Sequence, residues 1–593
     1  NEQQSTRVGM AQNRLRPNVI IVLTDDQGYG DLSCHGNPVL RTPHLDRLHA
    51  ESIRLTDFHV APMCTPTRCQ LMTGRDSLTG GACFVDGGRT MMRTEHPTMA
   101  EIFSEGGYRT GLFGKWHLGD HYPYRPEDRG FQEVVRHCAW GITSVPDYWL
   151  NDYFDDHYWH NGEIQPYEGY CTDVWFREAM DWMRSCQAND EPFLAYIATN
   201  APHGPFFVGD DFRNDYGDQN TAVASFFGMI ACIDANMGEL DAMLKETGLH
   251  ENTVLIYMTD NGGTAGVETH NAGMRGRKTD LYEGGHRVPC FVRWPAGNLR
   301  DPGDVSCLTH VQDLLPTLTD LCGIDRAVDS PEGCSLAPIL CGEADDAGER
   351  TLVVQYGVHP RLPFEVEWCG DPCKWCAAVM KGRWRLVYGS ELYDLNADPG
   401  QCADVAEAHP DVVAELRAFY ESWWAEREPH IFEWCYIPIG EDAAPEVCLT
   451  SHTWLTDPVT MQSTGGAANS LRLGTPKNGP WNISVQKPGP YRIALRRWPR
   501  EARTAIRRGV PEHMPADDTH GPFPEGRALP IAAARIRIAG MDVSVPIGDD
   551  DEEAAFTVEL PSGCMQLQSA FLDADGNELC GAYYAYVTDL ARN

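Results

Sequence analysis

Long apolar runs are missing from this 593-residue sequence, and positive charges are too few to balance its acidic side chains. No stretch of about 18 consecutive apolar residues occurs, which predicts that no segment crosses a membrane. Lys and Arg number 48 against 85 Asp and Glu, so the formal net charge is −37. A surface this acidic repels polyanions, and we therefore expect neither nucleic acid nor an anionic membrane as a partner.

A signal-peptide segment is also missing, because residues 1–18 contain no apolar stretch. The 21 cysteines are odd in number and spread over a long chain, which predicts mostly buried free thiols rather than a disulfide scaffold. These features favour a cytoplasmic location. A signal peptide removed earlier would leave the same picture and would fit a periplasmic or secreted protein. Cys369, Cys373 and Cys376 are spaced like zinc ligands, but no clear fourth ligand lies near them.

The apolar pattern divides the chain into four parts. An N-terminal extension covers 1–16, and residues 17–345 alternate continuous apolar runs with helical patterns, which predicts a large doubly wound α/β sheet with helices on both faces. Residues 346–428 predict a small α+β subdomain with antiparallel hairpins and one helix. Residues 429–593 predict a β-rich, sandwich-like domain. In the large domain, strands are expected at 19–24, 110–114, 193–199 and 253–259, and a long helix is expected to stop at Gly248.

Polar side chains follow four of these apolar runs, at the sheet edge where ligands gather in α/β proteins. Asp25 and Asp26 follow the first run, and Asp260 and Asn261 follow the run at 253–259. Either pair alone would suit a helix cap. Together they offer a cluster of hard oxygens, which is the ligand type that Ca²⁺ or Mg²⁺ prefers.

Nitrogen bases follow the other two runs. Lys115 and His117 come after the run at 110–114 and are expected to face the same side because strand side chains alternate. His203 follows the run at 193–199. Lys278 lies in a basic segment between Arg277 and the acidic Glu283. Alone, each group would suit a structural histidine or a solvated loop, whereas their joint position favours a functional site.

The segment APMCTPTRCQLMTGR, residues 61–75, holds the candidate nucleophile. Pro66 suits the first turn of a helix, which places Cys64 at or just before the helix N-terminus and Arg68 one turn further along. The helix dipole and the guanidinium both favour an anion beside Cys64. A thiolate nucleophile is one interpretation. Soft sulfur is nevertheless an awkward neighbour for hard-oxygen metal ligands, so the arrangement makes better sense if position 64 carries an oxygen.

With these motifs in place, the sequence resembles the type I sulfatases of the alkaline phosphatase superfamily, in which Cys-x-Pro-x-Arg marks a cysteine that is oxidised to formylglycine. The segment CTPTRCQLMTGR matches the longer signature, with Thr67 and Cys69 departing from the common residues outside its core. Further blocks match in order: TDDQGYGDLSCHGNP, GYRTGLFGKWHLG, APHGP, TDNGG and RKTDLYEGGHRVP. The resemblance covers residues 17 to 428 and implies an alkaline-phosphatase-like fold for the large domain. The β-rich part after 429 lies outside the common family core.

The resemblance implies a metal site and a modified residue. Four side chains and an oxygen of the modified Cys64 would bind Ca²⁺, with Mg²⁺ as the alternative: Asp25, Asp26, Asp260 and Asn261. The formylglycine would be made from Cys64 by a separate maturation enzyme and would be held by Arg68. A family serine near the sulfate has no certain match, and Thr143 and Ser144 are the nearest candidates.

The resemblance also implies the reaction, hydrolysis of sulfate monoesters by a formylglycine gem-diol through a covalent sulfo-enzyme intermediate. Lys115 and Lys278 would bind the sulfate oxygens. His203 would protonate the leaving oxygen, and His117 would take the proton of the second hydroxyl as sulfate is eliminated.

Two alternative functions remain open: a phosphonate monoester or phosphodiester hydrolase on the same scaffold, and a non-catalytic binder of sulfated glycans. The aromatic and acidic segment 141–162 indicates a sulfated carbohydrate substrate, although the same composition would suit a packed loop, and aryl sulfates also remain candidates. Residues 356–368 form a second candidate rim. The sequence predicts no oligomeric state.

Overall fold

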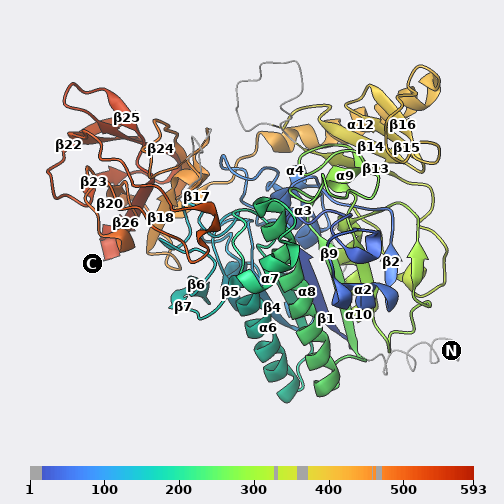
Figure 1. Cartoon of the computed structure of the whole chain (residues 1–593). Coiled ribbons are helices and arrows are strands. Elements are labelled where there is room, and N and C mark those ends of the chain that lie inside the picture. Colours follow the sequence, from blue (N-terminus) through green and yellow to red (C-terminus); the bar gives the residue numbers. More distant parts are fainter. Residues whose placement is uncertain (1–15, 326–331, 357–371, 457, 463–469, 593) are drawn as a thin grey trace, which may run out of the picture.

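The structure is a computed structural model that describes residues 16–325, 332–356, 372–456, 458–462 and 470–592. In this part of the chain the largest sheet has ten strands, and helices cover both of its faces (Figure 1). The five central strands, from β9 to β5, run parallel. The sheet order is β11 (Gly303–Val305), β2 (Ile53–Leu55), β10 (Cys290–Arg293), β9 (Thr253–Thr259), β1 (Asn18–Thr24), β8 (Phe193–Ala198), β4 (Arg109–Gly114), β5 (Glu133–Arg136), β6 (His157–His160) and β7 (Glu163–Pro166). The predicted doubly wound α/β domain with a large mixed sheet is confirmed.

The central strands are continuously apolar because both faces of the sheet are buried. Ile20 and Val22 of β1 face one layer of helices, and Val19, Ile21 and Leu23 face the other. The first layer contains α2 (Pro43–Ala50), α6 (Cys171–Ala188) and α8 (Thr221–Thr247), and the second contains α3 (Cys64–Thr73), α5 (Met99–Glu105) and α10 (Leu314–Cys322). Four-residue helices lie between these elements: α4 (Ser77–Gly80), α7 (Asp210–Arg213), α9 (Glu283–His286) and α11 (Ala337–Leu340).

Helix α8 is the longest helix in the described residues, and Gly248 in the left-handed conformation (φ 77°) ends it as the sequence predicts. Among the helices described, α8 alone is long and apolar enough, by length and composition, to cross a membrane. Most of that stretch, 72%, is buried inside the protein, where α8 packs against α6. A core helix of a large domain shows these same properties.

The chain after the large sheet forms a four-stranded antiparallel sheet covered by one helix, as predicted for the C-terminal subdomain. The strands are β13 (Thr351–Gln355), β14 (Ala377–Lys381), β15 (Trp384–Val387) and β16 (Glu391–Asp394), and the helix is α12 (Pro410–Ile431). Leu416, Tyr420 and Trp424 of α12 pack on the sheet through one apolar cluster. Helix α12 continues through Pro429, so it extends a little beyond residue 428.

The β-rich part consists of two sheets that share one apolar core, in agreement with the predicted sandwich. One sheet contains β17 (Ile437–Ile439), β19 (Trp481–Val485), β24 (Gly563–Leu572), β21 (Ala533–Ile538), β22 (Met541–Pro546) and β25 (Glu578–Cys580). The other contains β18 (Glu446–Thr450), β26 (Tyr584–Asp589), β20 (Gly489–Arg496) and β23 (Ala554–Leu560). This domain, orange to red in Figure 1, packs on the large domain, for example through Tyr584 Oη, which donates to Val145 O at 2.8 Å.

The cysteines behave as the sequence predicts. In the described part of the chain all twenty are free thiols, and eleven of them are buried. Cys369 lies outside the described residues, as does the candidate rim at 356–368 except for Tyr356. Among the described side chains, no metal-ligating group of three or more members includes Cys373 or Cys376. The structure therefore gives no support to a zinc site there.

A buried ion network joins the C-terminal subdomain to the large domain. Arg385 of β15, which is 1% exposed, donates from Nε to Glu283 Oε1 at 2.7 Å and from Nη2 to Asp57 Oδ1 at 2.9 Å. Burial by itself would raise the pKa of Glu283, but the charges of Arg385, His59 and His286 together outweigh burial and lower that pKa to about 2. This network holds the segment that also carries Lys278.

Arg385→Met is expected to lower the free energy of unfolding by about 3–5 kcal/mol, because it leaves the buried Glu283 and the half-buried Asp57 without the charge of Arg385. Urea unfolding at neutral pH measures the loss. The stabilisation from Glu283 is fully present above its ordinary pKa of 4.5 and is lost as the pH falls towards about 2. Lys381→Met on the neighbouring strand removes an exposed pair with Glu415 and is the control. Equal effects of both substitutions would contradict the prediction.

Candidate active site

The carboxyl ends of four neighbouring strands converge on one polar cluster. Strand β8 lies between β1 and β4, and β9 lies on the other side of β1. In register, Thr24 pairs with Thr259, and Ala198 pairs with both Leu23 and Gly114. The residues that follow these strands therefore share one edge of the sheet, which is where the sequence analysis placed the site.

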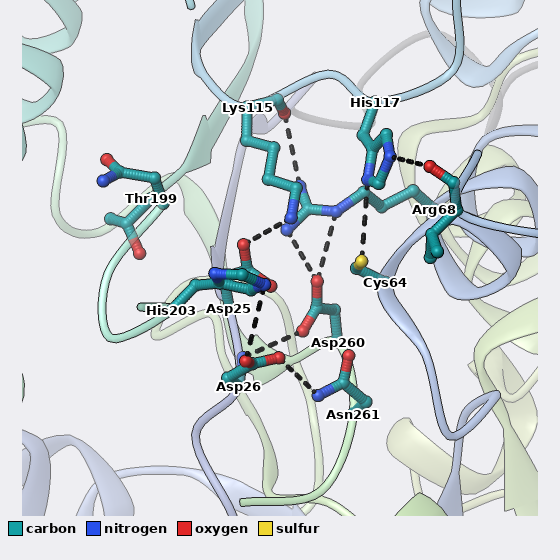
Figure 2. Close-up of polar contacts among 12 residues, drawn as sticks. Asp25, Asp26, Cys64, Arg68, Lys115, His117, Thr199, His203, Asp260 and Asn261 are labelled. Carbon is teal, nitrogen blue, oxygen red and sulfur yellow. Dashed lines mark hydrogen bonds and ion pairs between the residues drawn. The ribbon is translucent and has the colours of Figure 1, made fainter. Parts of the chain in front are cut away.

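Three ion pairs form the centre of the cluster, and Figure 2 shows those of Lys115 with Asp25 and of Arg68 with Asp260. Their nitrogen–oxygen distances are 2.5 Å for Lys115–Asp25, 2.6 Å for Lys278–Asp26 and 2.7 Å for Arg68–Asp260. With neutral histidines and all three carboxyl groups ionised, the three carboxylates and three cations would sum to zero charge. Burial alone would raise the pKa of Asp26. The charges of Lys278 and His203 outweigh burial and, with hydrogen bonds from Asn261 and Lys278, hold that pKa well below its usual value.

The oxygens at this edge fit a divalent cation. Asp25 Oδ1 and Asn261 Oδ1 are buried and have no hydrogen-bond partner among the residues that the structure describes. Ligand atoms of Asp25, Asp260 and Cys64 lie within 4.8 Å of one another. Burial, followed by the charge of Asp260, raises the pKa of Asp25 to about 8, a strain that a bound cation would relieve. Carboxylate and amide oxygens are the donors that Ca²⁺ and Mg²⁺ prefer.

Cys64 is the first residue of α3, after Met63 in extended conformation, and Pro66 lies in the first turn. This is the helix start that the sequence predicts. The Cys64 side chain is buried, and its Sγ lies 3.5 Å from His117 Nδ1. Burial raises the pKa of the Cys64 thiol, so an unmodified cysteine would stay protonated here. A neutral thiol is a poor nucleophile, which weighs against the thiolate interpretation.

Lys115 and His117 do not alternate along a strand, as the sequence analysis expected, because both residues lie beyond the end of β4. Strand β4 ends at Gly114, and His117 has a left-handed backbone with φ 58°. The turn after the strand directs Lys115 to Asp25 and His117 to Cys64 (Figure 2). A turn of this kind has no period of two, so the alternation rule does not apply.

The hydrogen bond to Val85 fixes which nitrogen of His117 faces Cys64. His117 Nε2 lies 3.0 Å from Val85 O, and because a carbonyl oxygen only accepts, Nε2 carries the proton. Nδ1 of the neutral ring then presents a lone pair towards Cys64. Burial, and next the charge of Lys115, hold the pKa of His117 well below its usual value. His117 is thus arranged as a proton acceptor.

His203 and Lys278 lie at the more accessible side of the cluster, with side chains 19% and 13% exposed. His203 Nδ1 donates to Gly204 O at 2.6 Å, and its Nε2 is 3.7 Å from Asp26 Oδ2. Burial and the charge of Lys278 lower the pKa of His203 to about 3. Trp140, with its ring centre 5.3 Å from that of His203, forms part of this side.

The expectation that Arg68 holds the formylglycine stays a prediction, because residue 64 is an unmodified cysteine in this structure. The Arg68 guanidinium donates to Asp260, to Lys115 O and to Tyr196 Oη, and none of the contacts in the described residues joins it to Cys64. Tyr196 was not predicted from the sequence, although it lies two residues before the end of a strand that leads to the site.

Two further candidates lie apart from the cluster. Ser144 Oγ donates to Cys138 O and the backbone N–H of Thr143 donates to Asp147, so no described contact brings either to the site residues. In the basic segment around Lys278, Arg275 stacks on Tyr282 with 3.7 Å from its guanidinium carbon to the ring centre. Lys278 alone of these reaches the carboxylates.

A protein-family model described as Sulfatase matches residues 17–324. The chain belongs to the sulfatase family. The sulfatase is similar to human arylsulfatase A, with 28% identity over 73% of this chain and 92% of that protein. It is also similar to N-acetylgalactosamine-6-sulfatase of Canis lupus familiaris, with 30% identity over 55% of this chain and 66% of that protein. Among solved structures, Ps i-CgsB in complex with k-i-k-neocarrahexaose has a TM-score of 0.62 at 25% identity, covering 69% of this chain and 93% of that one.

These findings confirm the family and the enzyme class that the sequence predicts. The sulfatase is a sulfuric ester hydrolase of the alkaline phosphatase superfamily. All ten candidate site residues, from Asp25 to Lys278, lie inside the matched range, and the β-rich domain lies outside it.

Proposed function

We propose that this sulfatase hydrolyses sulfate monoesters of carbohydrates, with Cys64 converted to formylglycine and Ca²⁺, or Mg²⁺ as the alternative, held at the sheet edge. The observation that carries the proposal is the position of Cys64, whose sulfur lies within 4.8 Å of the Asp25 and Asp260 ligand atoms and 3.5 Å from His117 Nδ1. Asp25, Asp26, Asp260 and Asn261 would hold the ion. When present, the ion and the hydrated aldehyde supply positive charge and an oxygen nucleophile.

The chain's own residues bind the sulfate and move protons. Lys115 and Lys278 are ammonium donors within the site, and each would give up part of its contact with a carboxylate to bind sulfate oxygens. The negative charge of a bound ester favours the imidazolium form of His203, which would then protonate the leaving oxygen. His117 Nδ1 would accept the proton from the side chain of residue 64. Val85 keeps that nitrogen free by holding the proton on Nε2.

Parallel assays on an aryl sulfate and an aryl phosphodiester test the reaction class. The expected result is a kcat/KM for the sulfate ester that exceeds the value for the phosphodiester, in enzyme whose formylglycine content has been measured. The reverse order would assign the protein to the phosphodiester alternative. Binding of sulfated glycans without any turnover, with Cys64 unmodified, would assign it to the non-catalytic alternative.

A cavity of about 400 Å³ lies between the large domain and the β-rich domain, and its lining suits a carbohydrate although none of the ten candidate site residues belongs to it. Tyr148 and Trp159, from the segment 141–162 that the sequence analysis singled out, line one side. Glu446, Arg500 and Tyr586 of the β-rich domain line the other. Aromatic faces and charged side chains together suit the apolar faces and hydroxyl groups of a sugar. The N-acetylgalactosamine-6-sulfatase relative and the saccharide complex of Ps i-CgsB support the same class of substrate.

Trp159→Ala is expected to raise KM about threefold to tenfold for a sulfated oligosaccharide, because one aromatic contact contributes about 0.5–1.5 kcal/mol. KM for a small aryl sulfate should stay unchanged, because it needs only the candidate site residues, none of which lines the cavity. Steady-state kinetics on both substrates provides the measurement. Trp423→Ala, on α12 of the C-terminal subdomain, is the matched control. An unchanged KM for the oligosaccharide, or an equal rise for the aryl sulfate, would remove the cavity from the proposal.

A further inference from the structure

A buried histidine of the β-rich domain lies against the candidate active site. His452 belongs to the short turn η6 (Ser451–Thr453), directly after β18, and is 1% exposed. The centre of its ring is 6.2 Å from that of His117, with 38° between the ring planes. The β-rich domain, although outside the range matched by the family, therefore reaches a residue of the cluster.

Neither ring nitrogen of His452 has a hydrogen-bond partner among the residues that the structure describes. Leaving a buried polar group unpaired costs about 1–3 kcal/mol, so such a group in an otherwise packed domain needs an explanation. The turn itself is fixed independently of the ring. The N–H of Ser451 donates to Tyr583 O at 2.8 Å, and its Oγ donates to Val459 O at 2.6 Å. The β-rich core therefore sets where the His452 ring lies.

The loop that orients His117 is supported from the same direction. Val85 O, which accepts from His117 Nε2, lies in a loop that contacts the chain between 434 and 455. The Arg89 guanidinium carbon is 3.4 Å from the centre of the Trp434 ring. A Cβ at Gly88 would come within 2.6 Å of Leu455 Cδ2, so the loop and this segment are in close contact. Both supports of His117, its hydrogen-bond partner and its ring neighbour, thus depend on this end of the β-rich part.

We propose that the β-rich domain completes the active site, and that His452 is a positioning residue whose ring holds the His117 imidazole with Nδ1 towards residue 64. The inference rests on the proposed function, because that function makes His117 Nδ1 the proton acceptor. His117 has contacts at both ring nitrogens, and a ring packed beside it limits rotation away from them. Small displacements of a proton-transfer group lower the rate steeply, so a rigid neighbour has a direct effect on turnover.

Kinetics of His452→Ala and His452→Phe with an aryl sulfate test this role. The alanine variant should lower kcat at least about tenfold while KM changes less than about twofold, because substrate contacts remain while the acceptor is misplaced. The phenylalanine variant restores the ring without its nitrogens and should recover most of kcat. His513→Ala, another histidine of the β-rich domain, with a partner in Asp152 and no ring contact to His117, should leave kcat unchanged.

Formylglycine content and melting temperature are measured on every variant. An unchanged kcat in His452→Ala, a fall that merely follows lost formylglycine, or a phenylalanine variant as slow as the alanine variant would overturn the proposal. A crystal structure of His452→Ala gives a second readout that does not depend on activity. The His117 Nε2–Val85 O hydrogen bond, 3.0 Å here, should lengthen or be lost, and an unmoved ring would also overturn it. Wild-type enzyme that carries formylglycine and hydrolyses no sulfate ester would instead refute the proposed function.

Discussion

Cys64→Ala is expected to lower kcat for an aryl sulfate more than about 10³-fold, since removal of a nucleophile leaves only binding and charge stabilisation. Alanine cannot be oxidised to an aldehyde, so no oxygen nucleophile forms at the start of α3. Cys69→Ala should retain most of the activity. Cys69 is buried five residues further along the same helix, beside Gly80, and burial raises the pKa of its thiol to about 12. It is therefore an inert core side chain and the matched control.

Mass spectrometry separates the two cysteines directly. Trypsin cleaves after Arg54, Arg68 and Arg75, so Cys64 and Cys69 fall in different peptides, 55–68 and 69–75. Conversion of the thiol to the aldehyde removes sulfur and two hydrogens and adds one oxygen. We expect this change in peptide 55–68 alone, and to the same extent as the fraction of active enzyme. Fully active enzyme with an intact thiol in that peptide would refute the formylglycine proposal.

The central strands and the site residues at their ends could be predicted because both follow from a parallel sheet that is buried on its two faces. Strands buried on two faces must be continuously apolar, and parallel strands must end at a common edge. Asp25 and Asp260 are far apart in sequence but follow strands that pair in register, Thr24 with Thr259. Nothing beyond the apolar pattern is needed to bring them together.

The residues that orient the site side chains could not be predicted, since no regular spacing in the sequence marks them. The direction of His117 depends on one left-handed residue, and its tautomer depends on a carbonyl in a loop 32 residues earlier in the chain. His452 comes from a domain that family resemblance does not cover. The ion pair of Arg68 with Asp260 was also not predicted. Asp260 was assigned to the metal, and the sequence position of Arg68, four residues after Cys64, suggested only a contact with residue 64.

Removal of the divalent ion is expected to abolish turnover, and re-addition of Ca²⁺ should restore it. Without the ion the site loses a double positive charge beside Asp25 and Asp260, so an anionic ester meets a weaker positive field. Asp25→Asn removes one ligand charge and should lower kcat more than about 10²-fold, comparable to loss of a main electrostatic contribution. Metal analysis of active protein that finds neither Ca²⁺ nor Mg²⁺ would refute the site.

Thermal unfolding tests the same site without relying on activity. An ion that binds only the folded state stabilises it by about 2.7 kcal/mol at a concentration 100 times its Kd, so Ca²⁺ should raise the melting temperature of the wild type. Asp25→Asn should lose most of that rise. Asp234→Asn alters another buried aspartate, which accepts from the Leu45 N–H at 2.7 Å in the α2 region, and should keep the full rise. Equal responses of the two variants would mean that Ca²⁺ binds elsewhere. The unpartnered oxygens of Asp25 and Asn261 would then need another partner, and the positive charge for the anionic ester would have to come from Lys115 and Lys278 alone.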